Sequence, residues 1–145
     1  VHSCIIEGNT VKILCLIVLV SWAVSTAAAS SKQVTLFIDA YNQHDIEKML
    51  EKTSEQVKWL YNIDDQILIE TDGKDALRTA MIAHFKQRSQ ARSQIKKSMT
   101  LGDTVAVIEE AFSNDGERSQ CALSIYQLKQ NLINSITYYS ATACE

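Results

Sequence analysis

The chain has 145 residues, of which 46% are hydrophobic and 21% are charged, and its formal net charge is −3. This length allows one globular domain of ordinary size, and the slightly acidic balance argues against a general binder of nucleic acid or another polyanion. One basic stretch over residues 86–97 carries no aromatic residues that could stack on bases, so we interpret it as solvated surface.

The N-terminal region has the layout of a secretory signal peptide. Lys12 precedes a nearly unbroken apolar run over residues 13–24, and small residues follow up to Ala29. A membrane anchor is the alternative, but the run is shorter than the roughly 20 residues that a spanning helix needs. We therefore predict that residues 1–29 direct export to the periplasm or the exterior and are removed, which leaves no membrane segment. Because the residues before Lys12 fit a signal poorly, a translation start at Val11 is a further hypothesis.

The predicted mature chain, residues 30–145, opens with two helices. Ser30 and Gln33 have the spacing of a capping box, which places the start of the first helix there. The apolar residues that follow recur at helical spacing and form one stripe: Val34, Phe37, Ile38 and Tyr41. After a break at residues 42–44, Asp45 is expected to cap a short second helix.

Two strands and a third helix are predicted next. Apolar and polar residues alternate over 56–61, as in a strand with one buried face, and a shorter strand is expected over 67–70. Gly73 marks a break, and a third helix begins at Lys74. One face of this helix carries Leu77, Ala80, Met81, His84 and Phe85.

The remainder of the chain has the pattern of an antiparallel meander. Gly102-Asp103 is a hairpin signal, and further turns are expected at residues 114–116 and 130–131. The four predicted strands span residues 92–101, 104–112, 118–128 and 132–142. Helices followed by a run of strands are typical of the α+β class.

Four segments carry a family resemblance: FIDAYNQHDIEKML at 37–50, DGKDALRTAM at 72–81, LGDTVAVIEE at 101–110 and QLKQNLINSITYYS at 127–140. In this order they resemble the nuclear transport factor 2-like superfamily, in particular its SnoaL-like polyketide cyclase and ketosteroid isomerase branches. The resemblance implies an α+β cone, in which three N-terminal helices wrap a strongly curved mixed, mostly antiparallel sheet. It also implies a homodimer formed through the outer sheet face. The superfamily includes enzymes, pseudo-enzymes and assembly modules, so the fold does not select a function.

The positions that match the ketosteroid isomerase machinery do not carry its chemistry. The donor tyrosine of that branch would fall at Phe37, which has no hydroxyl, and the carboxylate base at Tyr61, a poor base at neutral pH. The second acidic donor would lie within residues 121–128, which contain no carboxylate. We therefore expect no ketosteroid isomerase activity.

Other catalytic candidates are His84, Glu109 and Glu110. His84 lies on the helix face that should meet the sheet, where an imidazole can act as an acid or base near pH 7, although a buried structural histidine is the alternative. Neighbouring residues of a strand point to opposite faces, so one of the two glutamates should point inward and have a raised pKa. The sequence leaves open which one it is.

The predicted ligand pocket is apolar and aromatic, and it consists of Phe37, Tyr41, Trp59, Tyr61, Met81, His84 and Tyr126. Side chains of this kind suit a flat hydrophobic ligand, although aromatic residues on strands often belong to the ordinary core. No metal or cofactor is expected, because the three histidines are scattered and no glycine-rich phosphate loop is present in the sequence.

Cys121 and Cys144 remain after removal of the predicted signal. If residues 130–131 form a two-residue turn, Cys121 faces Ser140, which places the two sulfur atoms about 13 Å apart along the strand. A disulfide needs Cα atoms within roughly 7 Å of each other. We therefore predict two unpaired cysteines, with an intramolecular disulfide as the alternative if the tail folds back.

These observations predict an exported SnoaL-like protein that binds a small apolar or aromatic molecule without ketosteroid isomerase chemistry. One alternative is an uncharacterised isomerase, cyclase or hydrolase that uses His84 and an inward carboxylate. Another is a homodimeric assembly module that acts through its outer sheet face.

Overall fold

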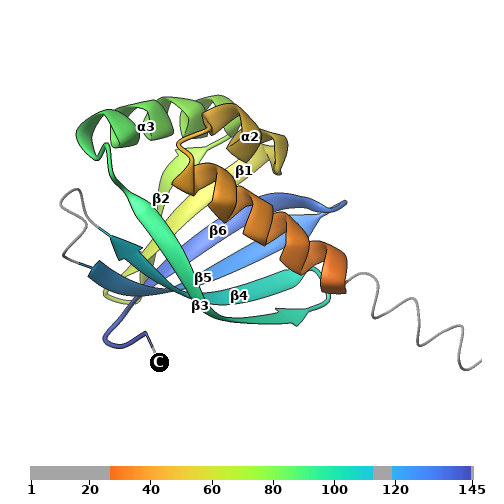
Figure 1. Ribbon diagram of the computed structural model, residues 1–145. Helices are drawn as coiled ribbons and strands as arrows, with labels where there is room; N and C mark the ends of the chain where they lie inside the picture. Colours follow the sequence, from red (N-terminus) through yellow and green to blue (C-terminus); the bar gives the residue numbers. More distant parts are fainter. Residues whose placement is uncertain (1–26, 113–118, 145) are drawn as a thin grey trace, which may run out of the picture.

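The computed structural model describes residues 27–112 and 119–144 of the chain. Within these residues, three helices lie against one face of a six-stranded sheet (Figure 1). The helices are the first helix over residues 27–42, α2 (Ile46–Glu51) and α3 (Lys74–Gln87). The strands are β1 (Thr53–Ile63), β2 (Gln66–Asp72), β3 (Arg92–Leu101), β4 (Thr104–Phe112), β5 (Ser119–Lys129) and β6 (Leu132–Ala141). We call the sheet face that the helices cover the inner face and the opposite one the outer face.

The sheet is mixed and mostly antiparallel. Its strand order is β2-β1-β6-β5-β4-β3, and every neighbouring pair is antiparallel except β1 and β6. This parallel pair joins the β1–β2 hairpin to the four-stranded meander and sets Tyr61 beside Tyr138. The predicted α+β class and order of elements are confirmed, whereas the strong curvature and the cone shape stay predictions.

Local sequence signals account for most of the helix and strand boundaries. The Asp45 side chain accepts a hydrogen bond from the Lys48 backbone N–H at 3.1 Å, as predicted for a helix cap. β3 and β4 have the predicted bounds, while β1 is longer than its alternating pattern because its pairing with β6 already begins at Thr53. The turn predicted at residues 114–116 lies outside the described residues.

The predicted start of the first helix was wrong. Residues 27–30 are already helical, and Ser30 is buried inside the helix rather than placed at its cap. The residues before Ser30 are alanines, which have the highest helix propensity, so the helix continues through the capping-box pattern.

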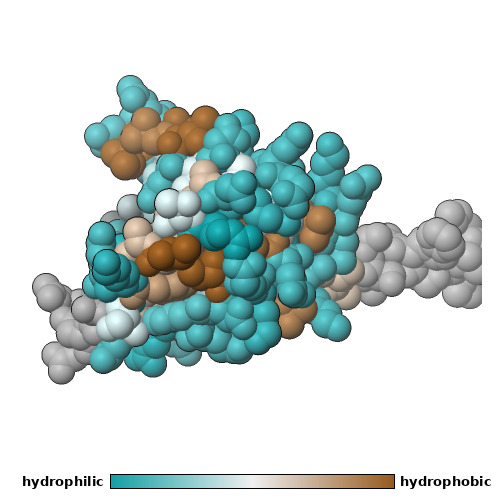
Figure 2. Space-filling view, turned by 90° about the horizontal axis from the view of Figure 1, so that it is seen from above, coloured by the Kyte–Doolittle hydropathy of each residue, from teal (hydrophilic) through white to brown (hydrophobic). Residues whose placement is uncertain are grey.

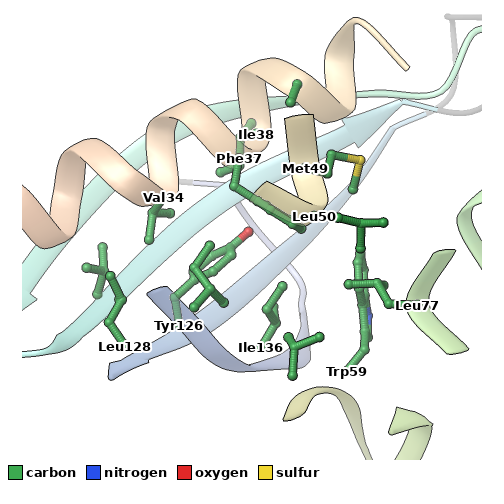
Figure 3. Packing of buried hydrophobic residues seen from close by; sticks show 14 of the residues in the cluster. Val34, Phe37, Ile38, Met49, Leu50, Trp59, Leu77, Tyr126, Leu128 and Ile136 are labelled. Carbon is green, nitrogen blue, oxygen red and sulfur yellow. The ribbon is translucent and has the colours of Figure 1, made fainter. Parts of the chain in front are cut away.

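One hydrophobic core fills the space between the helices and the inner face. Phe37 of the first helix points between Trp59 of β1 and Tyr126 of β5, with ring centroids 6.4 and 6.2 Å away (Figure 3). Leu77 of α3 and Ile136 of β6 are fully buried in the same cluster. Aromatic rings packed edge-on or tilted at such separations stabilise a core beyond their buried area alone.

The structure contains a disulfide between Cys121 and Cys144, which contradicts the prediction of two unpaired cysteines. An irregularity in the β5–β6 register shifts the pairing by one residue, so that Cys121 faces Ala141 rather than Ser140. β6 ends at Ala141, and the tail then turns back, which brings the two Cα atoms to 5.2 Å. The alternative considered from the sequence, a tail that folds back, is therefore the one observed.

Removing this disulfide should lower the stability of the folded chain. The bridge closes a loop over a sequence separation of 23 residues, for which the entropy of the unfolded chain predicts a loss of roughly 3 kcal/mol in the Cys144→Ser variant. Urea unfolding with and without reductant measures this loss of stability. The variant itself serves as the control, because reductant should no longer change the stability of the variant. Equal midpoints for wild type and variant under oxidising conditions would contradict this account.

Candidate functional site

The helices bury one end of the inner face. There, Val105 of β4, Leu128 of β5 and Ile133 of β6 are buried in one cluster with Val34 of the first helix and Met49 of α2. These apolar side chains fill this end, and the buried Thr53 hydroxyl already donates to Leu50 O at 2.9 Å, so this end is core rather than site.

The other end of the inner face is not covered by the described elements. Two rules identify the residues on the inner face. Inward and outward side chains alternate along each strand, and residues paired across two neighbouring strands point to the same face. At this end the inward side chains of five strands are exposed: Ile63, Leu68, Ala111, Gln120 and Ser140. We call this region the open end.

A buried carboxyl group lies at the boundary between the core and the open end. Glu109 is only 3% exposed, and its carboxylate oxygens accept hydrogen bonds from the hydroxyls of Ser93 and Ser124. The Tyr126 hydroxyl lies 3.5 Å from the same carboxylate. Burial raises the pKa of Glu109, and the three hydroxyl donors offset part of that increase.

The structure settles which of the two adjacent glutamates points inward. Glu109 faces Ala122 and Ser124 on the inner face, whereas Glu110 lies on the outer face and pairs with Lys96 at 2.8 Å. The hydrogen bond from Lys96 lowers the pKa of Glu110, and the Ser119 hydroxyl, 2.5 Å away, acts in the same direction. Glu109 is therefore the only one of the pair available to the candidate site.

His84 and Tyr41 form the helical side of the open end. Arg88 Nη1 lies 3.1 Å from His84 Nδ1, and because a guanidinium only donates, Nδ1 is the acceptor and the imidazole proton lies on Nε2. Nε2 then donates to the Tyr41 hydroxyl oxygen at 2.9 Å. Burial, followed by the charge of Arg88, lowers the pKa of His84, which keeps the ring neutral in this arrangement.

This arrangement leaves the proton of the Tyr41 hydroxyl available. Its oxygen accepts from His84, and no hydrogen bond among the described residues uses its proton. Burial, and then the nearby charge of Glu109, raises the pKa of Tyr41 to about 12, so the hydroxyl stays protonated at neutral pH. Tyr41 is therefore a hydrogen-bond donor at the edge of the core.

Aromatic rings from β1 and β6 form the opposite side. Trp59 stacks on Tyr138 with ring centroids 5.2 Å apart, and Tyr61 lies 5.6 Å from Tyr138. Burial raises the pKa of Tyr61 and raises that of Tyr138 strongly, because the Tyr138 hydroxyl lies deep although its ring is only half-buried. Two buried polar atoms nearby, Trp59 Nε1 and Thr71 Oγ1, have no hydrogen-bond partner of good geometry among the described residues.

The predicted pocket residues separate into two groups. Four of them, Phe37, Trp59, Met81 and Tyr126, are buried in the core. The other three, Tyr41, Tyr61 and His84, are half-buried at the open end. Tyr138 was not included in the predicted pocket, because its place beside Tyr61 follows from the parallel β1–β6 register, which the sequence pattern does not reveal.

The alternative enzyme hypothesis uses His84 together with an inward carboxylate, and the structure shows no direct contact between His84 and Glu109. Both ring nitrogens of His84 have other partners, namely Tyr41 and Arg88, and the Glu109 carboxylate is held by serine and tyrosine hydroxyls. Ser93 and Ser124 were missed by sequence reasoning. Their position diagonal to an inward glutamate on neighbouring strands was the only signal that could have found them.

No three His, Cys, Asp or Glu side chains within residues 27–112 and 119–144 are arranged to hold a metal ion. In the same part of the chain, no helix is both long enough and apolar enough to span a bilayer.

Comparison with known proteins identifies the family. The model of the SnoaL-like domain matches residues 34–136, so the chain belongs to this family. Among curated proteins, none matches the chain.

Solved structures show the same nuclear transport factor 2-like fold. A cystatin-fold protein from Novosphingobium aromaticivorans is 17% identical, with a TM-score of 0.66 over 76% of this chain and 97% of that one. A nuclear transport factor 2-like protein of unknown function from Cytophaga hutchinsonii is 18% identical, with a TM-score of 0.63 over 77% and 89%. A protein from Kribbella flavida, proposed to be a ketosteroid isomerase, is 12% identical, with a TM-score of 0.68 over 82% of both chains. At these identities the likeness establishes the fold alone.

The buried carboxyl group should make stability depend on pH in a specific way. Because the pKa of Glu109 in the folded chain is above its ordinary value of 4.5, the folded state binds its proton more tightly than the unfolded state. The free energy of unfolding should therefore fall as the pH rises from 4.5 through the folded pKa, and Glu109→Gln should remove this fall. Urea unfolding of wild type and variant between pH 4 and 8, about the range in which a raised carboxyl pKa lies, measures the difference.

The adjacent Glu110→Gln variant is the matched control. The pKa of Glu110 is lowered, so the wild type should gain stability relative to this variant only as the pH rises up to 4.5, and the difference should then stay constant up to pH 8. If the difference in the free energy of unfolding between the wild type and Glu109→Gln did not change with pH, burial would not perturb the pKa of this carboxyl group.

Proposed function

We propose that the protein binds a small, largely apolar or aromatic molecule at the open end, and that it does so without ketosteroid isomerase chemistry. The observation that carries the proposal is the Tyr41 hydroxyl, which stays protonated and whose proton has no acceptor among the described residues. A ligand that presents an acceptor atom, such as a carbonyl oxygen, would use this donor. Such a hydrogen bond would add to the affinity, because the half-buried hydroxyl has no competing acceptor among the described residues.

The rest of the open end supports an apolar ligand. The side opposite Tyr41 consists of the aromatic rings of Tyr61 and Tyr138, and the exposed Ile63 and Leu68 continue it outward. Aromatic and aliphatic side chains with a few placed donors are typical of small-molecule sites. Burial raises the pKa of Glu109, which favours the protonated form of the carboxyl group nearest to the site.

The absence of direct contact between His84 and a carboxylate favours binding over proton-transfer catalysis. A general base needs to lie within hydrogen-bond reach of the proton that it removes, and its orienting partner within reach of the base. Here Arg88 occupies the imidazole nitrogen that a carboxylate would orient. The matching positions for ketosteroid isomerisation are also occupied by Phe37 and Tyr61, neither of which is a base at neutral pH.

Coumarin and naphthalene form a matched pair of probes, because they have the same fused-ring shape and only coumarin carries a carbonyl acceptor. We expect coumarin to bind more tightly than naphthalene, and Tyr41→Phe to weaken coumarin binding about 5-fold while leaving naphthalene unchanged. Thermal shift and quenching of Trp59 fluorescence measure both affinities.

The control variant is Tyr139→Phe, because Tyr139 lies on the outer face next to Tyr138 and should not alter either affinity. If neither probe bound, or if Tyr41→Phe left the preference for coumarin unchanged, the proposed site would be wrong.

We also propose that the chain is exported and that it forms a homodimer through its outer face. The Cys121–Cys144 disulfide supports export, because such bridges persist in oxidising compartments. Neighbouring half-buried apolar side chains across the outer face support the dimer: Ala106, Ile108, Leu123, Ile125 and Tyr139. N-terminal sequencing of the secreted or periplasmic protein tests the export proposal, and recovery of an intact residue 1–29 segment would contradict it.

Sedimentation equilibrium tests the dimer. Leu123→Lys places a charge in the middle of the outer face and should reduce the mass to about half that of the wild type. Ile82→Lys is the control, because Ile82 is exposed on α3 and lies away from the sheet face. A wild type that is monomeric at high concentration would contradict the proposal.

A further inference from the structure

We propose that the free edge of β2 is a docking site for an extended segment of a partner protein, in which alternating apolar residues are flanked by basic residues. The partner segment would pair with β2 and extend the sheet by one strand. The central part of the site is Ile67, Leu68 and Ile69, and we call it the β2 edge. This inference does not rest on the ligand site proposed above, although Ile63 and Leu68 lie beside both sites.

The β2 edge is apolar on both faces of the strand. Ile67, Leu68 and Ile69 are 49%, 49% and 57% exposed, and because consecutive strand residues point to opposite faces, an apolar side chain is available on each side. Ile63, on the paired strand, is 52% exposed. Figure 2 shows hydrophobic side chains gathered at the upper left of the molecular surface, between hydrophilic ones. Contiguous exposed apolar residues of this kind mark interaction sites.

The backbone of the β2 edge is also available. The strand order places β2 at the end of the sheet with β1 as its only neighbour, so part of its backbone N–H and C=O groups has no strand partner within the described residues. An added strand satisfies such groups and gains specificity from its alternating side chains.

The middle of the opposite edge strand is protected by charge, although Met99 and Leu101 nearer its end are exposed, and the middle of the β2 edge has no such protection. β3 carries Lys96 and Lys97 near its middle, and charged lysines on an edge strand oppose pairing with another chain. β2 has isoleucine and leucine at the equivalent central positions and contains no lysine or arginine. The two edges differ although both belong to one sheet, which is expected if only one of them is used.

The charges around the β2 edge select the partner. Asp64 and Asp65 precede the apolar residues in the turn, and Glu70 follows them; none of the three forms an ion pair within residues 27–112 and 119–144. A fourth acid, Asp72 at the end of β2, does form an ion pair: its carboxylate lies 3.3 Å from Lys58 Nζ. A segment with basic residues at both ends would neutralise these acids, so charge complementarity favours it.

The same charges argue against a second copy of β2 as the occupant. Antiparallel self-pairing centred on Leu68 would set Gln66 against Glu70 and bring Glu70 of each copy next to the Asp64–Asp65 turn of the other. Like charges opposite each other across a strand pair are destabilising. The observations therefore favour a basic segment from a different protein.

The probe is the fluorescently labelled peptide KKVTVTVKK, and its binding to the oxidised full chain is followed by fluorescence anisotropy. We expect the basic peptide to bind at least about 10-fold more tightly than EEVTVTVEE, with a difference that shrinks at high salt because the flanking charges are exposed. The peptide KKVTPTVKK should bind weakly, because proline cannot donate to a strand ladder.

Variants identify the edge that is used. Ile67→Lys combined with Ile69→Lys should weaken the binding of KKVTVTVKK at least about 10-fold, since lysines protect an edge strand. Met99→Lys is the matched control, because Met99 is 71% exposed on the opposite edge strand, and it should leave the affinity unchanged. Should the double variant fail to fold, amide hydrogen exchange of the wild type still decides the question, and the peptide should slow exchange at residues 66–70.

Several outcomes would overturn the proposal: no binding of the basic peptide, equal affinity for the basic and acidic peptides, or protection of β3 rather than β2. A wild type whose dimer dissociates in the Ile67→Lys and Ile69→Lys variant would also overturn it, because a second copy would then be the occupant.

Discussion

The parallel pairing of β1 with β6 is the constraint on which the rest of the structure depends. It is the only contact between neighbouring strands, among those described, that joins the N-terminal hairpin to the C-terminal meander. Through it, Trp59 and Tyr61 reach Tyr138, and the aromatic side of the open end is completed. Parallel strands need a long connection, and here nearly the whole chain between Thr53 and Ile133 serves as that connection. Such pairing is slow to form because a long loop must close before its contacts stabilise it.

The covering helices then decide where the inner face is core and where it can meet a ligand. Phe37 packs between Trp59 and Tyr126 and marks where the fully buried region ends on the side of the open end. Beyond this limit the buried groups become polar, and burial raises the pKa values of Glu109 and Tyr41, which favours their uncharged forms. A site of neutral donors beside aromatic rings suits a neutral, flat molecule better than an anion or a cation. The membership of the chain in the SnoaL-like family fits this layout without naming a reaction.

Residue patterns were sufficient to predict most of the fold. The bounds of β3 and β4, the Asp45 cap and the turn at residues 130–131 follow from local signals, and each was found where it was predicted. These features depend on neighbouring residues only, through hydrogen bonding of a cap, alternation along a strand and the conformational preferences of turn residues. The resemblance to a family supplied the remaining step, the packing of the helices on the sheet.

The candidate site could be predicted only in part, because its geometry depends on pairings between distant segments. Alternation required that one of Glu109 and Glu110 point inward, but only the position of the helices decides which. The Cys121–Cys144 bridge depends on a register shift near Gln127, which no local pattern signals. The role of Tyr138 likewise follows from the long-range contact between β1 and β6.

The central claim is that the uncovered end of the inner face, and not the outer face or the core, receives a small molecule. Aromatic ring resonances of the tyrosines, followed by nuclear magnetic resonance as coumarin is added, test this most directly. The account predicts shifts for Tyr41, Tyr61 and Tyr138, which lie at the open end, and none for Tyr139 on the outer face. Shifts of Tyr139 alone, or saturable binding that leaves Tyr41 and Tyr61 unchanged, would contradict it.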